Sequence, residues 1–395
     1  MFLRNGRIGI FDLSAKEFVE EELPEELTLD SVSSLRTSKN LLAKHGSDSI
    51  VLGTGILTGS LIPASCAGTV VAGEKMMPLL GHAGIELKLS GFDFLVVNGK
   101  TSSSGYLWIR DGIAEFVDFP DSHAFDSWQR TDKIRSDQGD SKIQALSGGS
   151  WCDAGNPAAQ LVIDYWGGED KAGVGAEFGK KNLTAIAFRG MGELEIANPD
   201  AHYEESVSLM KSHLSSLGPN RGLQSYFGGA VREDFASLVH RSMGCFGCPF
   251  PCRTFLKTEE DPKEMHLVHK EPGYLHYDIS ALATSFELDL SLRNTTTALI
   301  RCARAGTEPV SALTACAAGG GKVDLASLDR LLANPSRIEP SRKGNFESSF
   351  SERKDYETCL GLGLCPRYWA KAGFDLEAMS PSIESAIGAP MPSGE

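Results

Sequence analysis

Three closely spaced cysteines could hold a metal centre. Cys245, Cys248 and Cys252 form a C-x2-C-x3-C pattern in the segment GCFGCPFPC. Thiolates bind Zn²⁺ and iron–sulfur clusters, and the first pair alone has the spacing of a redox dithiol. The third cysteine favours a metal, and the neighbouring prolines and phenylalanines would stiffen the loop and exclude water. Because a triplet with one distant cysteine is typical of a [4Fe–4S] site, we expect that cluster, with zinc or uncoordinated thiols as alternatives.

The fourth ligand has several candidates further along the chain. Cys302 and Cys316 lie in apolar helical patterns, which are typical of thiols in a hydrophobic core. Cys359 and Cys365 flank the segment LGLGL, whose glycines allow close approach of the backbone to a prosthetic group. The spacing does not choose among the four cysteines.

The cysteine count and the net charge limit the expected compartment and the expected kinds of partner. The nine cysteines are an odd number, and the first residues carry no apolar secretion signal, so we expect a cytoplasmic protein without a disulfide framework. The net charge of −14 argues against a nucleic-acid partner. The uncharged run 51–73 is long enough to cross a membrane, but its Gly, Thr, Ser and Pro content favours short strands and tight turns. We therefore expect no membrane span.

The elements that must position these cysteines change in character along the chain. Residues 1–197 carry alternating or short apolar runs broken by Gly and Ser, with one helical pattern over 24–46. From an Asn-Pro-Asp start signal onward, helical periodicity dominates residues 198–395, including 232–243. The order predicts an α+β fold, with an N-terminal β-layered domain followed by a helical domain.

Five segments, taken in order, resemble the tungsten- or molybdenum-pterin aldehyde:ferredoxin oxidoreductase family. The closest is GHAGIELKLSGFDFLVVNGK at 81–100, and KAGVGAEFGKKNLTAIAFRG at 171–190 is also similar. The others are VLGTGILTGSLIPAS, GCFGCPFPC and the GLC at 363–365. The resemblance implies that Cys365 is the fourth cluster ligand.

The resemblance also implies a fold, an activity and a set of cofactors. In the family a β-layered domain forms a base for two pterins that hold tungsten or molybdenum, with Mg²⁺ balancing their phosphates. Aldehyde and water become carboxylate, and the cluster passes electrons to ferredoxin or another redox subunit. The residues at the matching cofactor positions here are His82, Lys171, Ala172, Gly173, Gly175 and Glu308, and Asp278 is the nearest match to the catalytic carboxylate. The structural alternatives to cofactor binding are that His82 is simply part of a turn and that Gly173 and Gly175 make a tight turn before a helix.

Departures from the family pattern support a second hypothesis. Gly68 or its neighbour replaces an arginine that bridges pterin and cluster in the family, and Leu360 replaces an aspartate. The family's proton-relay histidine comes from a region that is shortened here around 321–355 to a polar linker. The first hypothesis is an oxidoreductase acting on an aldehyde-type small molecule. The alternative is a catalytically silent relative that carries electrons, or acts as a scaffold, in an oligomer or larger complex.

Overall fold

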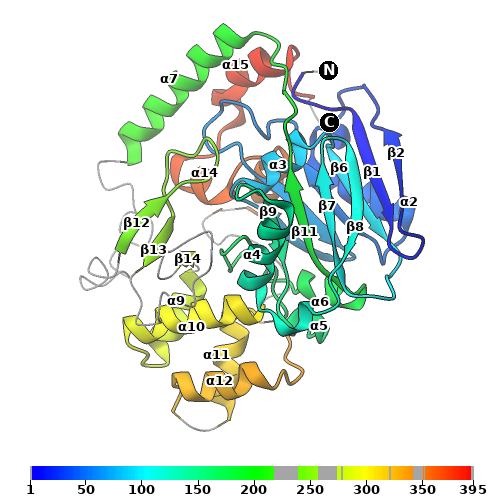
Figure 1. The fold of residues 1–395 in the computed structure, drawn as a ribbon. Coiled ribbons are helices and arrows are strands. Elements are labelled where there is room, and N and C mark those ends of the chain that lie inside the picture. The colour runs from blue at the N-terminus through cyan, green and yellow to red at the C-terminus, as the bar shows by residue number, and fades with distance from the viewer. Residues whose placement is uncertain are drawn as a thin grey trace.

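The computed structural model describes residues 2–217, 239–256, 274–276, 279–319, 322–340, 350 and 352–392. Two sheets are built before residue 190, and helices dominate the rest, so the prediction of an α+β fold is confirmed. In the view of Figure 1 the two sheets lie on the right and most of the later helices lie above and below on the left.

The first sheet has six strands in the order β2-β1-β6-β3-β4-β5. Only β1 and β6 run parallel, and every other pairing in it is antiparallel. Its strands are β1 (Arg7–Asp12), β2 (Glu17–Glu22), β3 (Ile50–Thr54), β4 (Gly68–Ala72), β5 (Lys75–Leu79) and β6 (Phe94–Asn98). The prediction of short strands within 51–73 is thus confirmed by β3 and β4.

The second sheet has five strands in the order β10-β9-β11-β7-β8. The parallel pair is β7 with β11, at its centre. Its strands are β7 (Gly105–Arg110), β8 (Ile113–Asp118), β9 (Gln144–Ser147), β10 (Val162–Ile163) and β11 (Leu183–Arg189). Short helices connect and cover the sheets: α1 (Leu29–Val32), α3 (Ala83–Leu89), α5 (Ser150–Asp153) and α6 (Val174–Lys180).

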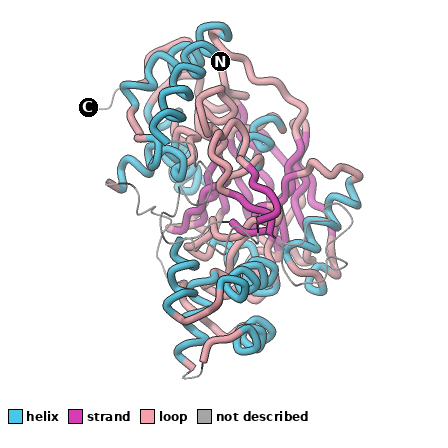
Figure 2. The backbone as a smooth tube through the Cα atoms, turned by 90° about the vertical axis from the view of Figure 1, so that its left-hand side faces the viewer, coloured by secondary structure: helices cyan, strands magenta, loops and turns pink. Residues whose placement is uncertain are grey.

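Alternating side chains arrange these elements in layers. On β6, Leu95 and Val97 belong to the largest core, together with Ile186 of β11 and residues of α3 and α6. Phe94 and Val96 point to the opposite face, which α2 (Ser34–His45) covers. The helix α4 (Ser127–Gln138) covers the outer face of the second sheet. Figure 2 shows the strands gathered centrally, with helices around them.

The second half of the chain contributes two helical groups. One contains α10 (Leu292–Ala305), α11 (Pro309–Ala318) and α12 (Leu325–Ala333), which share a separate core, and α9 (Ile279–Glu287), which packs against α10 and α11. The other contains α13 (Arg353–Gly361), α14 (Pro366–Ala372) and α15 (Leu376–Ile387), which return to pack against α7 (Pro199–Leu217) and α2. No helix among the described residues is long and apolar enough to span a membrane. The domain division at 197/198 stays a prediction.

A small third sheet interrupts the helical region. It contains β12 (Val239–Met243), β13 (Arg253–Leu256) and β14 (Tyr274–His276). The helix predicted over 232–243 is therefore wrong at 239–243, because pairing with β13 overrides the local helical periodicity. Residues 232–238 of that prediction lie outside the described part of the chain.

Candidate metal centre

The cysteine triplet lies on the loop that joins β12 to β13. Met243 and Arg253 pair at the base of this hairpin and close it. Within the loop, the Cys248 amide donates to the Cys245 carbonyl at 3.1 Å. Gly247, between these two cysteines, has φ +59° in the left-handed region, which glycine adopts without a steric penalty. The hairpin therefore presents three thiols from one short turn.

The loop after β3 brings Cys365 to this hairpin. The Ala64 amide donates to the Gly247 carbonyl at 3.0 Å, and the Cys365 amide donates to the Ala64 carbonyl at 2.9 Å. The approach is close: a Cβ added to Gly363, whose φ is +96°, would lie 2.2 Å from the Thr58 hydroxyl. The glycine of the GLC segment is thus required by packing. Segments more than a hundred residues apart meet at one site.

The four predicted ligands share a buried environment. Cys245, Cys252 and Cys365 are 8%, 5% and 3% exposed, and Cys248 is half-buried in the same cluster. Burial raises the pKa of Cys248 and of Cys252, and the nearby Cys245 and Cys365 sulfurs raise both further. The four sulfurs are therefore close enough to interact electrostatically.

This donor set fits an iron–sulfur cluster. Within the described residues, no three His, Cys, Asp or Glu side chains are grouped to hold a single metal ion. A [4Fe–4S] cluster binds its four thiolates through four different irons, so its ligands do not have to converge on one point. The four cysteines lie in or against one buried core that also contains Phe250, Tyr368 and Trp369, and such surroundings keep water from a cluster.

Cys66 is a fifth cysteine at this site. It is fully buried, and hydrogen bonds with Cys245 and Cys365 raise its pKa well above the usual range. It lies alone in the uncharged run 51–73, where no spacing signal marks it. Sequence reasoning missed it for that reason.

Of the other fourth-ligand candidates, two lie in a different core, and Cys359 lies in the same core as the cysteine site. Cys302 and Cys316 belong to the separate core of α10 to α12, as the structural interpretation of these thiols predicts. Cys359 lies on α13, and its sulfur donates to the Leu364 carbonyl at 3.7 Å. Of these four candidates, Cys365 is the one whose charge raises the pKa of both Cys248 and Cys252.

Arg253 is a buried cation directly beside the cysteines. It follows Cys252 in the chain, is 1% exposed, and its guanidinium carbon lies 5.3 Å from the centre of the Trp166 ring. A Cβ on Gly81 would lie 2.4 Å from Arg253 Nη1, so a glycine is needed there. Burial opposes the guanidinium charge, but Cys245 and other negative groups nearby outweigh it and raise the pKa of Arg253. Sequence reasoning did not single out this residue.

His82 lies at the edge of the same site. Its ring meets Phe246, between the first two cysteines, edge-on at a centroid distance of 6.5 Å. Burial lowers the pKa of His82, and the neighbouring Arg253 lowers it further, so the imidazole is neutral at pH 7. The preceding Gly81 carbonyl accepts a hydrogen bond from the Phe246 amide at 3.1 Å.

The glycine loop at 171–175 closes on a carboxylate of the chain itself. Asp170 accepts hydrogen bonds from the amides of Gly173, Val174 and Gly175 at 2.9, 2.9 and 2.8 Å. Gly173 has φ +77°, and a Cβ there would lie 2.0 Å from the Pro157 carbonyl oxygen. These contacts are those of a tight turn before α6. Cofactor binding by this loop, including Lys171 and Ala172, stays a prediction.

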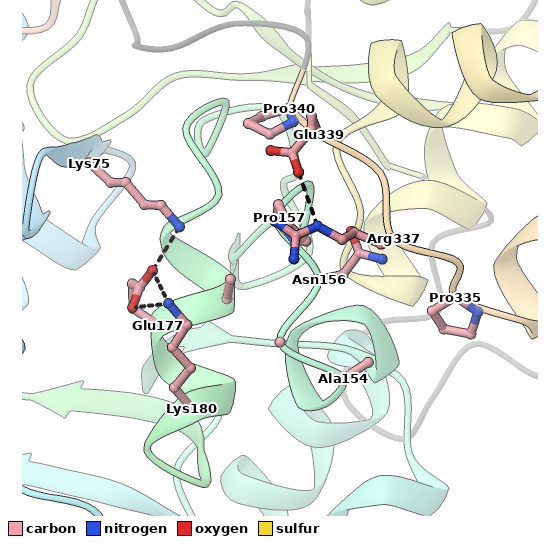
Figure 3. Close-up of a pocket in the computed structure, with 12 residues that line it drawn as sticks. Lys75, Ala154, Asn156, Pro157, Glu177, Lys180, Pro335, Arg337, Glu339 and Pro340 are labelled. Carbon is pink, nitrogen blue, oxygen red and sulfur yellow. Dashed lines mark hydrogen bonds and ion pairs between the residues drawn. The ribbon is translucent and has the colours of Figure 1, made fainter.

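A cavity of about 530 Å³ lies behind this loop (Figure 3). Lys75 and Lys180 both pair with Glu177 there, at 2.7 and 2.9 Å, and Arg337 lies across the cavity. None of the residues predicted for the cofactor site lines it. Each of these three cations is paired with a carboxylate in the described part of the chain, because Arg337 also pairs with Glu339 at 3.2 Å.

The two predicted acidic residues have different outcomes. Glu308 is buried and caps the start of α11, accepting hydrogen bonds from the Val310 and Ser311 amides at 3.1 and 2.7 Å. Its roles as helix cap and as cofactor ligand would compete for the same oxygens. Asp278 lies outside the described residues, so its catalytic role stays a prediction.

Comparisons with known proteins agree with this architecture. Residues 10–190 match the family model "Aldehyde ferredoxin oxidoreductase, N-terminal domain". A tungsten-containing aldehyde ferredoxin oxidoreductase from Pyrococcus furiosus is 28% identical over 49% of this chain and 34% of its own length. The enzyme of that name from Thermococcus kodakarensis is 27% identical over 62% of this chain and 48% of its own length. The matches thus span less than half of these relatives.

A solved structure resembles nearly the whole chain. It is titled "Active site complex BamBC of Benzoyl Coenzyme A reductase in complex with 1,5 Dienoyl-CoA". The similarity has a TM-score of 0.68 and covers 98% of this chain and 61% of that chain, at 16% sequence identity, so it supports the fold alone. Residues 10–190 thus match the N-terminal domain of the aldehyde ferredoxin oxidoreductase family, and the chain has partial and divergent similarity to that family's tungsten-containing enzymes.

Proposed function

We propose that Cys245, Cys248, Cys252 and Cys365 hold a [4Fe–4S] cluster, and that the chain is an aldehyde ferredoxin oxidoreductase-like redox protein. The observation that supports this proposal is that backbone bonds join the hairpin and the GLC segment through Ala64, and that their cysteines share one buried core. When bound, such a cluster supplies one-electron transfer. The chain contributes four thiolates, an aromatic surrounding that excludes water, and the buried guanidinium of Arg253.

The substrate side of the proposal rests on the family. The relatives are named tungsten-containing, which supports a tungsten or molybdenum bis-pterin, with Mg²⁺, on the β-rich domain. In this reading Lys171 and the loop Ala172–Gly175 bind the pterin phosphates, Glu308 accepts from the pterin, and His82 contributes to cofactor binding. Asp278 acts as general base on water during oxidation of an aldehyde-type substrate. Ferredoxin or another redox subunit then accepts the electrons.

A specific observation favours a second candidate function. The amides of Gly173 and Gly175 donate to Asp170, and Glu308 is engaged as a helix cap. Groups that are expected to bind pterin thus already have hydrogen-bond partners within the chain. The cysteines expected to bind the cluster, by contrast, lie in or against one buried core. A catalytically silent electron-transfer or scaffold subunit would have this pattern. The structural neighbour is itself a component of a complex by its title, which is consistent with that role.

Cysteine variants and elemental analysis test the cluster. We expect anaerobically purified protein to contain about four irons and equal sulfide per chain. Cys365→Ser should lose most of this iron. Cys359→Ser is the matched control, because Cys359 is a buried thiol of the same core on α13 that is not a proposed ligand, and it should keep the iron. A colourless zinc protein, or equal iron loss in both variants, would contradict the proposal.

Two further measurements separate the enzyme from the silent subunit. The enzyme should contain tungsten or molybdenum near one equivalent, and an aldehyde should reduce its cluster anaerobically. The silent subunit should contain iron without pterin, and its cluster should be reduced only by a partner or a chemical reductant.

A further inference from the structure

Arg253 has hydrogen-bonding capacity that the described residues do not use. Its Nε and Nη2 atoms are both buried and have no hydrogen-bond partner within the described part of the chain. A buried donor without an acceptor costs about 1–3 kcal/mol, and more when it is charged. Such a cost in a native fold indicates an acceptor outside the described residues, and a bound prosthetic group is one.

Packing holds this guanidinium in place on two sides. Trp166 supports its face with the guanidinium carbon 5.3 Å from the ring centre, and Phe255 packs edge-on against that ring at 5.2 Å. On the other side Gly81 packs closely against the guanidinium: a Cβ at this position would lie 2.4 Å from Arg253 Nη1. A long, flexible side chain is thus fixed in one orientation before any ligand binds.

The candidate acceptors beside Arg253 are the sulfurs of the cysteine site, because Cys245 and Cys252 both act on its charge. Arg253 is the residue after Cys252 and begins β13 at the base of the cysteine hairpin. The carboxylates near it have other partners: Glu169 pairs with Arg367 at 2.7 Å, and Asp164 pairs with Arg135 at 2.9 Å. A cluster bound by the cysteines would add negative charge next to Arg253.

We propose that Arg253 donates hydrogen bonds to the sulfurs of the bound [4Fe–4S] cluster and raises its reduction potential. The inference rests on the proposed function and adds a positioning and tuning residue to it. The reduced cluster carries one more negative charge than the oxidised cluster. A fixed cation at hydrogen-bonding distance in a buried site therefore stabilises the reduced state more.

Redox titration of the cluster, followed by electron paramagnetic resonance, tests this role. At a fixed ambient potential we expect Arg253→Gln to lower the ratio of reduced to oxidised cluster about tenfold, which equals about 59 mV for one electron. Arg253→Lys keeps the charge without the planar fork and should give a smaller shift in the same direction. Use of protein without tungsten or molybdenum confines the readout to the cluster.

Arg130 provides the matched control. It is also fully buried, but its guanidinium bonds to the Ser122 and Gly148 carbonyls and to Asp153. Arg130→Gln should lower stability and leave the cluster potential unchanged.

Iron analysis distinguishes failure of the proposed cluster from failure of the proposed role of Arg253. Wild-type protein without iron would refute the proposed function and this inference together. Iron at wild-type amounts in Arg253→Gln with an unchanged potential would refute the role of Arg253 alone. An equal shift in Arg130→Gln would also refute it, because the change would then reflect general loosening of the fold.

Discussion

At the scale of single residues, Lys88 shows how a charge can be held inside the β-rich half. It is 1% exposed, and its ammonium donates to the carbonyls of Gly55, Ile56 and Thr58 at 2.9, 3.1 and 3.1 Å. These carbonyls lie on the loop that continues to Cys66. Burial lowers the pKa of Lys88 from 10.5 to about 8, although Asp93 acts in the opposite direction.

That lowered pKa predicts a pH dependence of stability. Between pH 8 and 10.5 the unfolded chain holds the Lys88 proton and the folded chain does not. The free energy of unfolding should therefore gain up to about 3 kcal/mol from this group as the pH rises through that window. Urea unfolding at pH 8, 9 and 10 should show a smaller slope with pH in Lys88→Met than in wild type. Equal slopes would contradict the prediction.

Cys66 carries a second residue-scale prediction. Its thiol hydrogen-bonds to Cys245 and Cys365, but the triplet and Cys365 already supply four thiolates. We expect Cys66→Ala to keep iron and sulfide at wild-type amounts, because the variant removes a neighbour and not a ligand. Iron loss as large as in Cys365→Ser would instead make Cys66 a cluster ligand.

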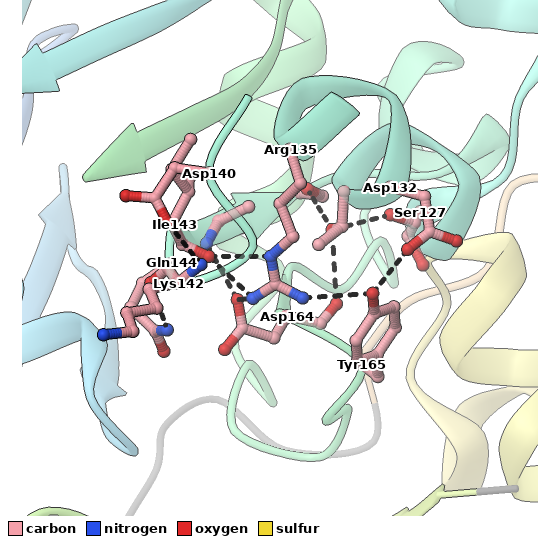
Figure 4. A network of polar contacts seen from close by, with 12 residues as sticks. Ser127, Asp132, Arg135, Asp140, Lys142, Ile143, Gln144, Asp164 and Tyr165 are labelled. Atoms are coloured by element: carbon pink, nitrogen blue, oxygen red, sulfur yellow. Dashed lines mark hydrogen bonds and ion pairs between the residues drawn. The ribbon is translucent and has the colours of Figure 1, made fainter. Parts of the chain in front are cut away.

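At the scale of elements, a polar network fastens α4 to the second sheet (Figure 4). Arg135 donates to the Ile143 carbonyl at 2.8 and 2.6 Å, to the Tyr165 hydroxyl at 3.0 Å and to Asp164 at 2.9 Å. Tyr165 in turn donates to Asp132, one turn earlier on α4. The network fixes the segment 164–166, whose Trp166 supports Arg253.

Removal of Arg135 should cost much more than removal of an exposed arginine. Arg135→Met would leave Asp164 buried without its counter-charge, and we expect a loss of about 3–5 kcal/mol in the free energy of unfolding. Arg353→Met removes an exposed pair with Glu357 on α13 and should cost about 1 kcal/mol or less. Denaturant unfolding measures both. A similar effect of the two variants would show that the network adds no special stability.

Elements also explain which parts of the site could be predicted from sequence. The triplet was found because its three cysteines are local in sequence, and hydrophobic alternation identified strands such as β3 and β4. Cys66 and Arg253 were missed because their roles depend on contacts between distant segments. A lone cysteine and a single arginine carry no periodicity. The strand β12 was predicted as helix because its partner β13 lies across the cysteine loop.

At the scale of the whole molecule, the cysteine site joins the beginning, middle and end of the chain. The C-terminal segment with α13 to α15 packs into the core that contains the cysteines. A buried ion pair helps to fix it to the β-rich half: Arg367, two residues after Cys365, donates to Glu169 at 2.7 Å, with side chains 4% and 1% exposed. The position of Cys365 therefore depends on docking of the whole C-terminal segment.

This dependence predicts that Arg367→Gln acts on docking before it acts on global unfolding. Glu169 would lose its buried ion pair with Arg367, at a cost of about 3 kcal/mol, which corresponds to a roughly hundredfold faster local opening. Hydrogen exchange should speed up by that factor in α13 to α15 and stay unchanged in α4, and iron should be lost faster to a chelator. Arg353→Gln, on the exposed side of α13, is the control and should change neither. Uniform acceleration across both regions would mean that the C-terminal segment is not a separate unit, because the ion pair would then stabilise the entire fold at once.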